Sequence, residues 1–210
     1  MPKKAAAGAP RIAPEVDGNI CVYCGSGLGV NPAYAAAASS LGQALASSKL
    51  GLVYGGGGLG LMGTVAKSTL AAGGRVTGII PTFLSSKEQM LKDVHELIIT
   101  DTMHERKMMM FERSDGFVAL PGGIGTLEEL VEQLTWSQLG RHKKPIVLAN
   151  IDGFWTPFLS LLAHMKGETF IRAGLDVAFI VVDRAEQIVP ALLANMGVAR
   201  GQPAGTIAKF

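Results

Sequence analysis

The sequence predicts a single Rossmann-like α/β domain, in which helices cover both faces of a doubly wound parallel sheet. Strand-like and helix-like segments alternate along the 210 residues, which is typical of α/β folds. Several strand-like segments are near-continuous apolar runs, which indicates burial on both faces. Three strands are followed by glycine-bearing loops, and ligands in such folds bind at the carboxyl ends of the strands. We therefore expect the three loops to meet at one edge of the sheet and to form a site there.

The first half of the chain contains four predicted strands, at residues 19–24, 50–55, 75–81 and 95–100. A helix over residues 31–47 follows the first strand, with Asn31 as its candidate N-cap and Pro32 at its first position. A glycine loop over residues 55–60 leads from the second strand into a helix over residues 61–73. The third strand ends at Pro81.

The second half of the chain continues the alternation. Predicted strands lie at residues 116–121, 144–151 and 177–182, and predicted helices at residues 102–114, 126–140, 155–167 and 185–197. Within the helix over 126–140, the helical period places four apolar side chains on one face, namely Leu127, Leu130, Val131 and Leu134. We expect this face to be buried.

The two ends of the chain read differently from the middle. Residues 1–18 and 198–210 are expected to be flexible tails around one folded domain over residues 19–197. No apolar run reaches the roughly 18–20 residues of a membrane span, and the N-terminal region lacks the apolar core of a signal peptide. A net charge of +2 does not indicate a nucleic-acid partner. We expect a cytoplasmic protein with neither membrane nor nucleic acid as its partner.

The two cysteines, Cys21 and Cys24, form a CxxC pattern, which can be a redox pair or half of a zinc site. Here the pattern lies within a predicted strand, where residues three apart point to opposite faces of the sheet. There is no second CxxC or nearby histidine cluster. We therefore expect two plain buried thiols and no metal site.

Residues 58–63, GLGLMG, match the G-x-G-x-x-G fingerprint of dinucleotide-binding folds. Such a site also needs an acidic residue about 20 positions further on, to hold the ribose hydroxyl. No Asp or Glu occurs between Gly58 and Glu88, and the loop follows the second strand instead of the first. An NAD site is therefore not favoured. A tight turn and close helix packing account for part of the loop, but five glycines over residues 55–60 exceed that need. A P-loop is excluded too, because Ala66 stands where glycine must precede the lysine.

Residues 121–126, PGGIGT, form a second glycine loop that turns directly into a helix. Glycine-rich backbone and a helix N-terminus together present N–H groups suited to a phosphate. The competing interpretation is a capping box, with Thr126 followed three residues later by Glu129. Glu128 would then be a solvated acid of the first turn. The local pattern leaves both interpretations open.

A phosphate at this loop would lie near two carboxylates, so the site needs cations. The segment MHERK supplies Arg106 and Lys107, on the helix that precedes the same strand. Arginine is a good bidentate partner for phosphate or carboxylate. The alternative for both residues is a solvated helix face.

Together, PGGIGTLEE, MHERK, YGGGGLGLMG and CGS resemble the LOG ("Lonely Guy") family of cytokinin riboside 5′-monophosphate phosphoribohydrolases, formerly labelled lysine decarboxylases. The similarity covers residues 19–197. It implies a nucleotide-binding catalytic domain that hydrolyses the N-glycosidic bond of purine nucleoside 5′-monophosphates, AMP or its N6-modified cytokinin forms. It also implies a homodimer. We expect no metal and no cofactor.

By motif position, the resemblance implies that Arg106 and Glu129 are the catalytic pair. It also implies a set of substrate contacts: Glu88, Arg106, Lys107, Gly122, Gly123, Ile124, Gly125, Thr126, Leu127, Glu128, Glu129 and Thr135. A carboxylate beside the anomeric carbon can stabilise the positive charge that builds there and activate water. Successive helix residues diverge by about 100°, so Glu128 and Glu129 have different roles. The alternative is a non-catalytic carrier of nucleotides or of the molybdenum cofactor on the same fold.

Overall fold

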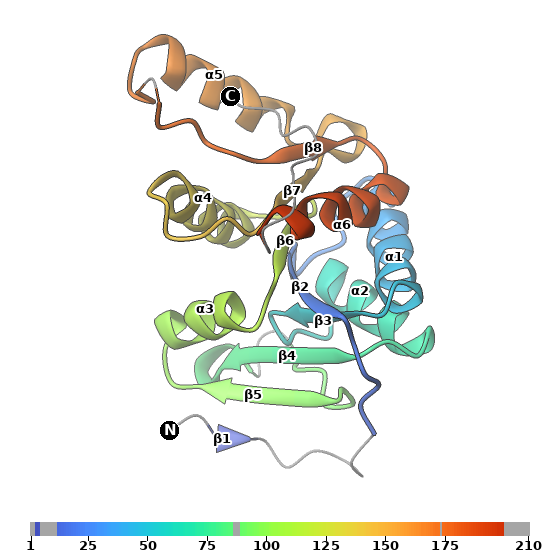
Figure 1. Cartoon of the computed structure of the whole chain (residues 1–210). Helices are drawn as coiled ribbons and strands as arrows, with labels where there is room; N and C mark the ends of the chain where they lie inside the picture. The colour runs from blue at the N-terminus through green and yellow to red at the C-terminus, as the bar shows by residue number, and fades with distance from the viewer. Residues whose placement is uncertain (1–2, 5–11, 86–88, 173, 200–210) are drawn as a thin grey trace.

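The computed structural model describes residues 3–4, 12–85, 89–172 and 174–199. Its described strands form one eight-stranded sheet in the order β1-β5-β4-β3-β2-β6-β7-β8 (Figure 1). All neighbouring pairs are parallel except β1 with β5. From β2 the chain proceeds outward to β5 on one side, and from β6 outward to β8 on the other. The predicted doubly wound α/β fold is confirmed.

The central strands are buried on both faces, which explains their continuous apolar sequences. The parallel strands are β2 (Gly18–Tyr23), β3 (Leu50–Tyr54), β4 (Val76–Pro81), β5 (Glu96–Thr100), β6 (Gly116–Ala119), β7 (Ile146–Ala149) and β8 (Ile180–Val182). Each matches a predicted segment. The last strand is shorter than the segment predicted at residues 177–182. Val177 and Phe179 are buried in the core, as their apolar character indicates, but they lie outside the strand. An apolar run indicates burial, and burial does not require a ladder of hydrogen bonds.

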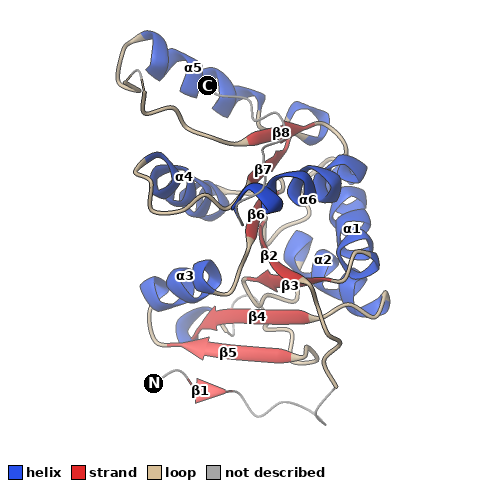
Figure 2. Cartoon of the chain, viewed as in Figure 1, coloured by secondary structure: helices blue, strands red, loops and turns tan. Residues whose placement is uncertain are grey.

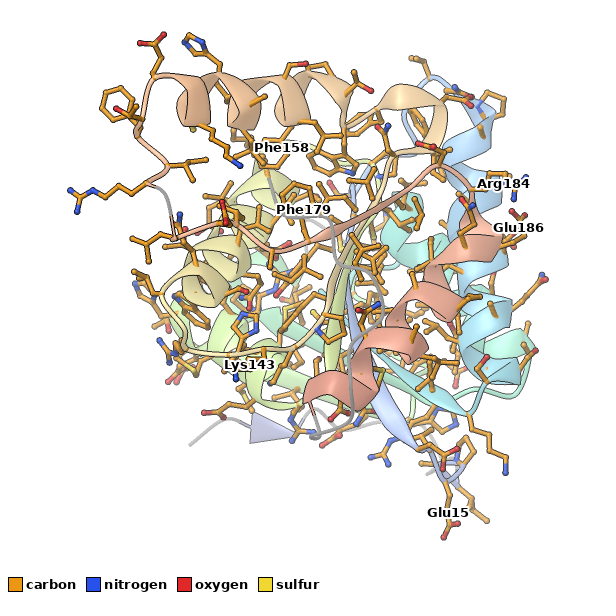
Figure 3. The ribbon with its side chains drawn as sticks, turned by 45° about the horizontal axis from the view of Figure 1, so that its top comes forward. Glu15, Lys143, Phe158, Phe179, Arg184 and Glu186 are labelled. Atoms are coloured by element: carbon orange, nitrogen blue, oxygen red, sulfur yellow. The ribbon has the colours of Figure 1, made fainter. Side chains whose placement is uncertain are left out.

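Helices cover both faces of the sheet (Figures 1 and 2). One layer contains α1 (Pro32–Ser47), α2 (Gly60–Ala71) and α6 (Ile188–Ala199), and the other contains α3 (Met103–Glu112), α4 (Ile124–Gln138) and α5 (Thr156–Gly167). Short 3₁₀ turns occur at Thr82–Leu84, Ile151–Gly153 and Ala185–Gln187, the last within the predicted helix over 185–197. Each layer has its own apolar cluster. Figure 3 shows Phe158 on the underside of α5, near Phe179 of the second cluster.

The two cysteines lie in different apolar clusters, on opposite faces of the sheet. Both are buried and neither forms a disulfide, and burial raises the pKa of the Cys21 thiol. The prediction of two plain buried thiols is confirmed. Asn31 caps α1 as predicted, by accepting a hydrogen bond from the N–H of Ala33 at 2.9 Å.

Both predicted tails extend partly beyond the described residues. Within residues 1–18, β1 (Lys3–Lys4) pairs with Ile99 and Ile98 of β5, and Gly18 opens β2. Residues 1–2, 5–11 and 200–210 lie outside the described part, and α6 runs to Ala199. Among the helices that the structure describes, none is both long and apolar enough to cross a membrane.

Candidate active site

Three loops meet at the carboxyl edge of the sheet, as the sequence predicts. The N–H of Gly25, after β2, donates to the carbonyl of Pro121, after β6, at 3.1 Å. The N–H of Leu61, beyond the loop after β3, donates to the carbonyl of Gly25 at 3.1 Å. The strand order reverses between β2 and β6. In open α/β sheets, that is the position where ligands bind.

A pocket of about 270 Å³ opens at this position. Residues 25–29 and 121–123 form its backbone walls, and Tyr34, Leu61 and Phe154 add apolar side chains. Two larger cavities, of about 330 and 280 Å³, lie at the amino ends of the strands. We assign the ligand to the carboxyl edge of the sheet, where the smaller pocket lies, because the glycine loops and the buried charged side chains are also at that edge. The sequence indicated the loops but not Tyr34 or Phe154, whose roles depend on how α1 and the turn after β7 pack.

Helix α4 begins two residues earlier than predicted. Its N-cap is Gly123, which makes no side-chain capping bond, and Thr126 is already its third residue. The capping-box interpretation of Thr126 and Glu129, which the sequence left open, is therefore wrong. The Thr126 hydroxyl instead lies against Gly122, where an added Cβ would be 2.2 Å from it. The first N–H groups of α4 thus have no side-chain cap and remain positioned for an anion.

Nothing within the described chain requires glycine at Gly123 or Gly125. Neither has a positive φ, and a Cβ built on either one would meet no atom within 4 Å. Gly122 is different, because a Cβ there would clash with Thr126. Glycines that serve neither a special backbone conformation nor internal packing are expected where a ligand approaches the backbone closely.

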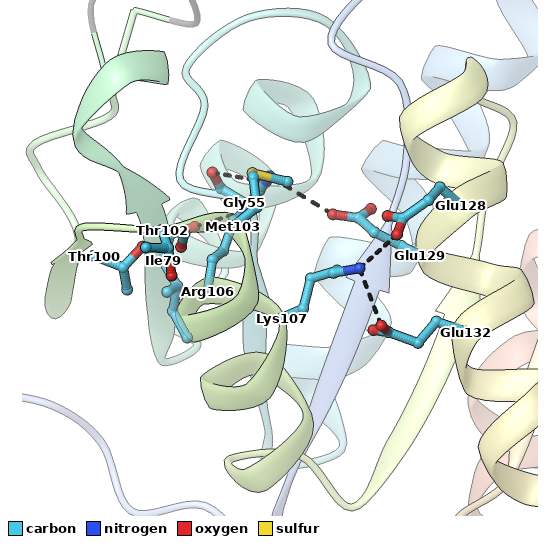
Figure 4. A network of polar contacts seen from close by, with 10 residues as sticks. All are labelled: Gly55, Ile79, Thr100, Thr102, Met103, Arg106, Lys107, Glu128, Glu129 and Glu132. Carbon is cyan, nitrogen blue, oxygen red and sulfur yellow. Dashed lines mark hydrogen bonds and ion pairs between the residues drawn. The ribbon is translucent and has the colours of Figure 1, made fainter.

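Arg106 is held deep in the site, only 5% exposed. Its Nε donates to the carbonyl of Ile79 at 3.2 Å, and Nη2 donates to the carbonyl of Gly55 at 3.3 Å (Figure 4). These bonds fix the guanidinium plane and leave Nη1 directed toward Glu129, 3.7 Å from Oε1. Helix α3 is itself well capped, by a capping box of Thr102 and Glu105. The solvated-face alternative for Arg106 is wrong.

Glu129 extends from α4 toward Arg106 and is 8% exposed. Removing a carboxylate from water is costly without a compensating charge, and Arg106 supplies it. At 3.7 Å the contact is an ion pair and is longer than the 2.7–2.9 Å, approximately, of a tight charge-assisted hydrogen bond. A buried carboxylate beside a fixed cation, at the ligand edge of the sheet, is the arrangement expected of a reactive pair.

Lys107 is also buried, with 8% of its surface exposed, so its solvated-face alternative is wrong too. Its Nζ donates to Glu128 Oε1 at 2.5 Å and to Glu132 Oε1 at 3.0 Å (Figure 4). Burial lowers the pKa of Lys107, but the bonds to Glu128 and Glu132 outweigh it and the pKa is raised overall. Glu128 and Glu129 do have different partners, as predicted. Glu132 was not anticipated, although its spacing of four residues from Glu128 was a usable signal.

The remaining predicted contacts are more dispersed. Ile124 is 83% exposed and Leu127 is half-buried against the core. Thr135 donates its hydroxyl to the carbonyl of Val131 in its own helix, and it lies about 13 Å along α4 from Thr126 by helix rise. Val131 is 41% exposed, so the prediction that it lies on a buried face of the helix is wrong. Glu88 lies outside the described residues.

The GLGLMG loop is not built as a dinucleotide site. The N–H groups of Leu61 and Met62 at the start of α2 donate to the carbonyl of Gly25, so that helix end is occupied by the chain itself. Gly56 and Gly60 have positive φ, and a Cβ on Gly58 would lie 2.5 Å from a carbonyl oxygen. Internal packing therefore explains more of these glycines than the sequence suggested. Among the described residues, no three His, Cys, Asp or Glu side chains group as a metal ion would require.

The fold and site define a Rossmann-like α/β protein with an uncapped helix start and buried charge pairs at the switch point. A family model described as "Possible lysine decarboxylase" matches residues 62–192. A cytokinin riboside 5′-monophosphate phosphoribohydrolase of Arabidopsis thaliana is 43% identical over 182 residues, covering 87% of this chain and 80% of that protein. A probable one of Oryza sativa subsp. japonica is 45% identical over 172 residues, covering 82% and 77%. The chain belongs to this family, the LOG family.

Solved structures confirm the fold. The molybdenum cofactor carrier protein of Chlamydomonas reinhardtii superposes with a TM-score of 0.64 at 23% identity, covering 86% of this chain and 98% of that one. The molybdenum cofactor binding protein of Rippkaea orientalis gives a TM-score of 0.62 at 24% identity, covering 82% and 93%. At these identities the likeness concerns the architecture alone.

Proposed function

We propose that the protein hydrolyses the N-glycosidic bond of cytokinin riboside 5′-monophosphates, which are N6-modified forms of AMP, and releases the free base and ribose 5-phosphate. One observation carries the proposal: the buried Arg106–Glu129 pair lies beside a helix start whose N–H groups have no side-chain cap. The relatives named above support the same reaction class.

In this proposal the start of α4 and Thr126 hold the 5′-phosphate. The N–H groups of Ile124, Gly125 and Thr126 are the first of the helix, and the partial positive charge of its N-terminus favours a dianion. Gly123 and Gly125 leave the phosphate oxygens room to reach these groups. The sugar then extends toward the charged pair between α3 and α4.

The reaction needs a negative charge near the anomeric carbon and a base for water. Glu129 serves both needs, because its carboxylate stabilises the oxocarbenium-like transition state and accepts a proton from the attacking water. The water oxygen bonds to the anomeric carbon, the bond from that carbon to the base nitrogen breaks with its electron pair going to the base, and a proton restores the neutral base. Arg106 anchors the nucleotide and orients Glu129.

The test is base release measured by chromatography with isopentenyladenosine monophosphate and with AMP. We expect turnover of at least one of them and a fall of about 10²–10⁴-fold in the Glu129→Gln variant, the range for losing a general base. Binding of AMP without any base release would favour the carrier alternative instead. Release from AMP but not from the N6-modified nucleotide would remove the cytokinin role while keeping the chemistry.

Lysine decarboxylation, the description attached to the family model, receives no support from Lys107. A lysine that forms a Schiff base must give up its proton, whereas Glu128 and Glu132 raise the pKa of Lys107. Its ammonium is therefore stabilised in the charged form.

The homodimer is also a proposal. Ile124, Val131 and Leu139 are 83%, 41% and 72% exposed, and their spacing places them along one side of α4. An exposed apolar stripe on the helix that carries the site is a suitable surface for a second copy. The cytoplasmic location stays a prediction from the sequence, which cell fractionation would test.

A further inference from the structure

Lys107 is shared between two carboxylates of α4 that differ in their surroundings. Glu128 and Glu132 are four residues apart, so both reach Lys107 Nζ, which lies between α3 and α4 (Figure 4). The side chain of Glu128 is 53% exposed, whereas that of Glu132 is 21% exposed and that of Lys107 is 9% exposed. Glu132 therefore lies on the inner side of the ammonium and Glu128 at the mouth.

The position of Glu128 also places it nearer the anion site. It is the fifth residue of α4, about 5 Å of helix rise from Gly125, whereas Glu132 is one turn further along. An anion bound at the first N–H groups of α4 would therefore approach Glu128 first. Like charges at that separation repel unless one of them moves away.

The charges between α3 and α4 make such a movement favourable. Arg106 and Lys107 face Glu128, Glu129 and Glu132, which leaves one formal negative charge in excess before any substrate arrives. Glu128 is half-exposed, so its carboxylate regains contact with water when it turns away, while the buried ammonium of Lys107 keeps its bond to Glu132. Glu132 is mostly buried, and its Oε2 is shielded from solvent without a hydrogen bond from the residues that the structure describes.

We propose that Glu132 is a positioning residue that keeps Lys107 in the site, while Glu128 occupies the place on Lys107 that the anionic substrate takes. Substrate binding then exchanges one partner of the ammonium and keeps the other. The inference rests on the proposed function for the identity of the substrate, but the exchange itself requires only an anion at the start of α4.

The two glutamates are therefore expected to respond in opposite directions. Glu128→Gln removes a competitor for Lys107, so inorganic phosphate and AMP should bind several-fold more tightly. Glu132→Gln removes the negative charge of the inner partner and leaves only a neutral amide oxygen to accept from Lys107. The same two probes should therefore bind on the order of tenfold more weakly, and kcat should fall as well. Glu186→Gln, an exposed site on the opposite face of the sheet, is the matched control and should change neither quantity (Figure 3).

Calorimetry with phosphate and with AMP measures binding, and base release separates kcat from KM. Unchanged or weaker phosphate binding in Glu128→Gln would overturn the exchange, whatever Glu132→Gln does. Loss of thermal stability in Glu132→Gln with unchanged binding and kcat would reduce Glu132 to a structural residue and also overturn the proposal. Opposite shifts in phosphate affinity without any base release would uphold the exchange while refuting the proposed function.

Discussion

Replacing Gly125 with alanine separates a role in building the helix from a role in binding the ligand. The added methyl group should raise the stability of the protein but lower its activity. Gly125 is the second residue of α4, has no positive φ, and would accept a Cβ with no atom within 4 Å. Glycine within a helix costs roughly 0.5–1 kcal/mol relative to alanine, and the first turn realises only part of that. We expect a gain of about 0.5 kcal/mol, which for a domain of this size raises Tm by about 1–2 °C.

The same methyl group should impair catalysis. The Cα–Cβ bond tilts toward the helix N-terminus, so the methyl occupies the space in front of the N–H groups that would hold the phosphate. A displacement of the bound nucleotide by about 1 Å is enough to lower the rate about 10²-fold. We therefore expect a more stable protein whose kcat/KM for the nucleoside monophosphate falls by about that factor.

Thermal unfolding and base release measure the two effects on the same preparation. Gly167→Ala at the end of α5 is the matched control, because a Cβ there also meets no atom within 4 Å and the site is remote. It should leave kcat/KM unchanged. Full activity in Gly125→Ala would refute the assignment of this loop to the ligand, and a loss of stability would refute the claim that its space is open.

Three further predictions follow from the structure. Gly55→Ala would place a Cβ 2.1 Å from Arg106 Nη2, so the guanidinium must shift by roughly 1 Å. We expect a folded protein whose kcat/KM is about 10²-fold lower. Unchanged kinetics would contradict this prediction. Burial lowers the pKa of His142, so the unfolded chain takes up its proton first as pH falls below about 6.5, and the stability that the neutral ring provides is lost there. Denaturant titrations should therefore show that the difference in unfolding free energy between the native protein and the His142→Gln variant shrinks from pH 7.5 to pH 5. A difference that does not depend on pH would contradict this prediction. Val131→Glu, on the exposed side of α4, should convert the proposed dimer to a monomer in analytical ultracentrifugation, whereas an unchanged mass would place the interface elsewhere.

The fold could be predicted because each signal for it is local. Runs such as the one that forms β7 are apolar throughout, so burial on both faces can be read from consecutive residues. Local sequence patterns could not predict which segments form hydrogen bonds with neighbouring strands. The stretch before β8 is as buried as a strand, yet Phe179 lies outside the ladder. On α4, the exposure of Val131 follows from how the helix is rotated against the sheet, which the 3.6-residue period leaves open.

The site was predictable to the extent that it lies in two short motifs. Arg106 and Glu129 come from separate segments, and both were identified because each stands in a pattern of its own. The four-residue spacing of Glu132 from Glu128 does not identify its partner, because its contact with Lys107 exists only where α3 and α4 lie side by side on the same face of the sheet. Which side chains of two neighbouring helices meet is decided by how the helices pack, and a single sequence does not show that packing.

The capping-box interpretation, which the local pattern left open and the structure contradicts, bears directly on function. Thr126 and Glu129 have the spacing of a capping box, and the chain forms such a box elsewhere, from Thr102 and Glu105. At α4 the helix instead begins on Gly123, so Thr126 lies inside the first turn and Glu129 is directed toward Arg106. A capped start would satisfy the N–H groups with the protein's own side chains and leave little affinity for an anion. With glycine as its N-cap, the chain forgoes only a few tenths of a kcal/mol, approximately, of capping stability at the helix start where three glycine loops and two buried cations converge. A local rule broken at such a position is the expected signature of a binding site.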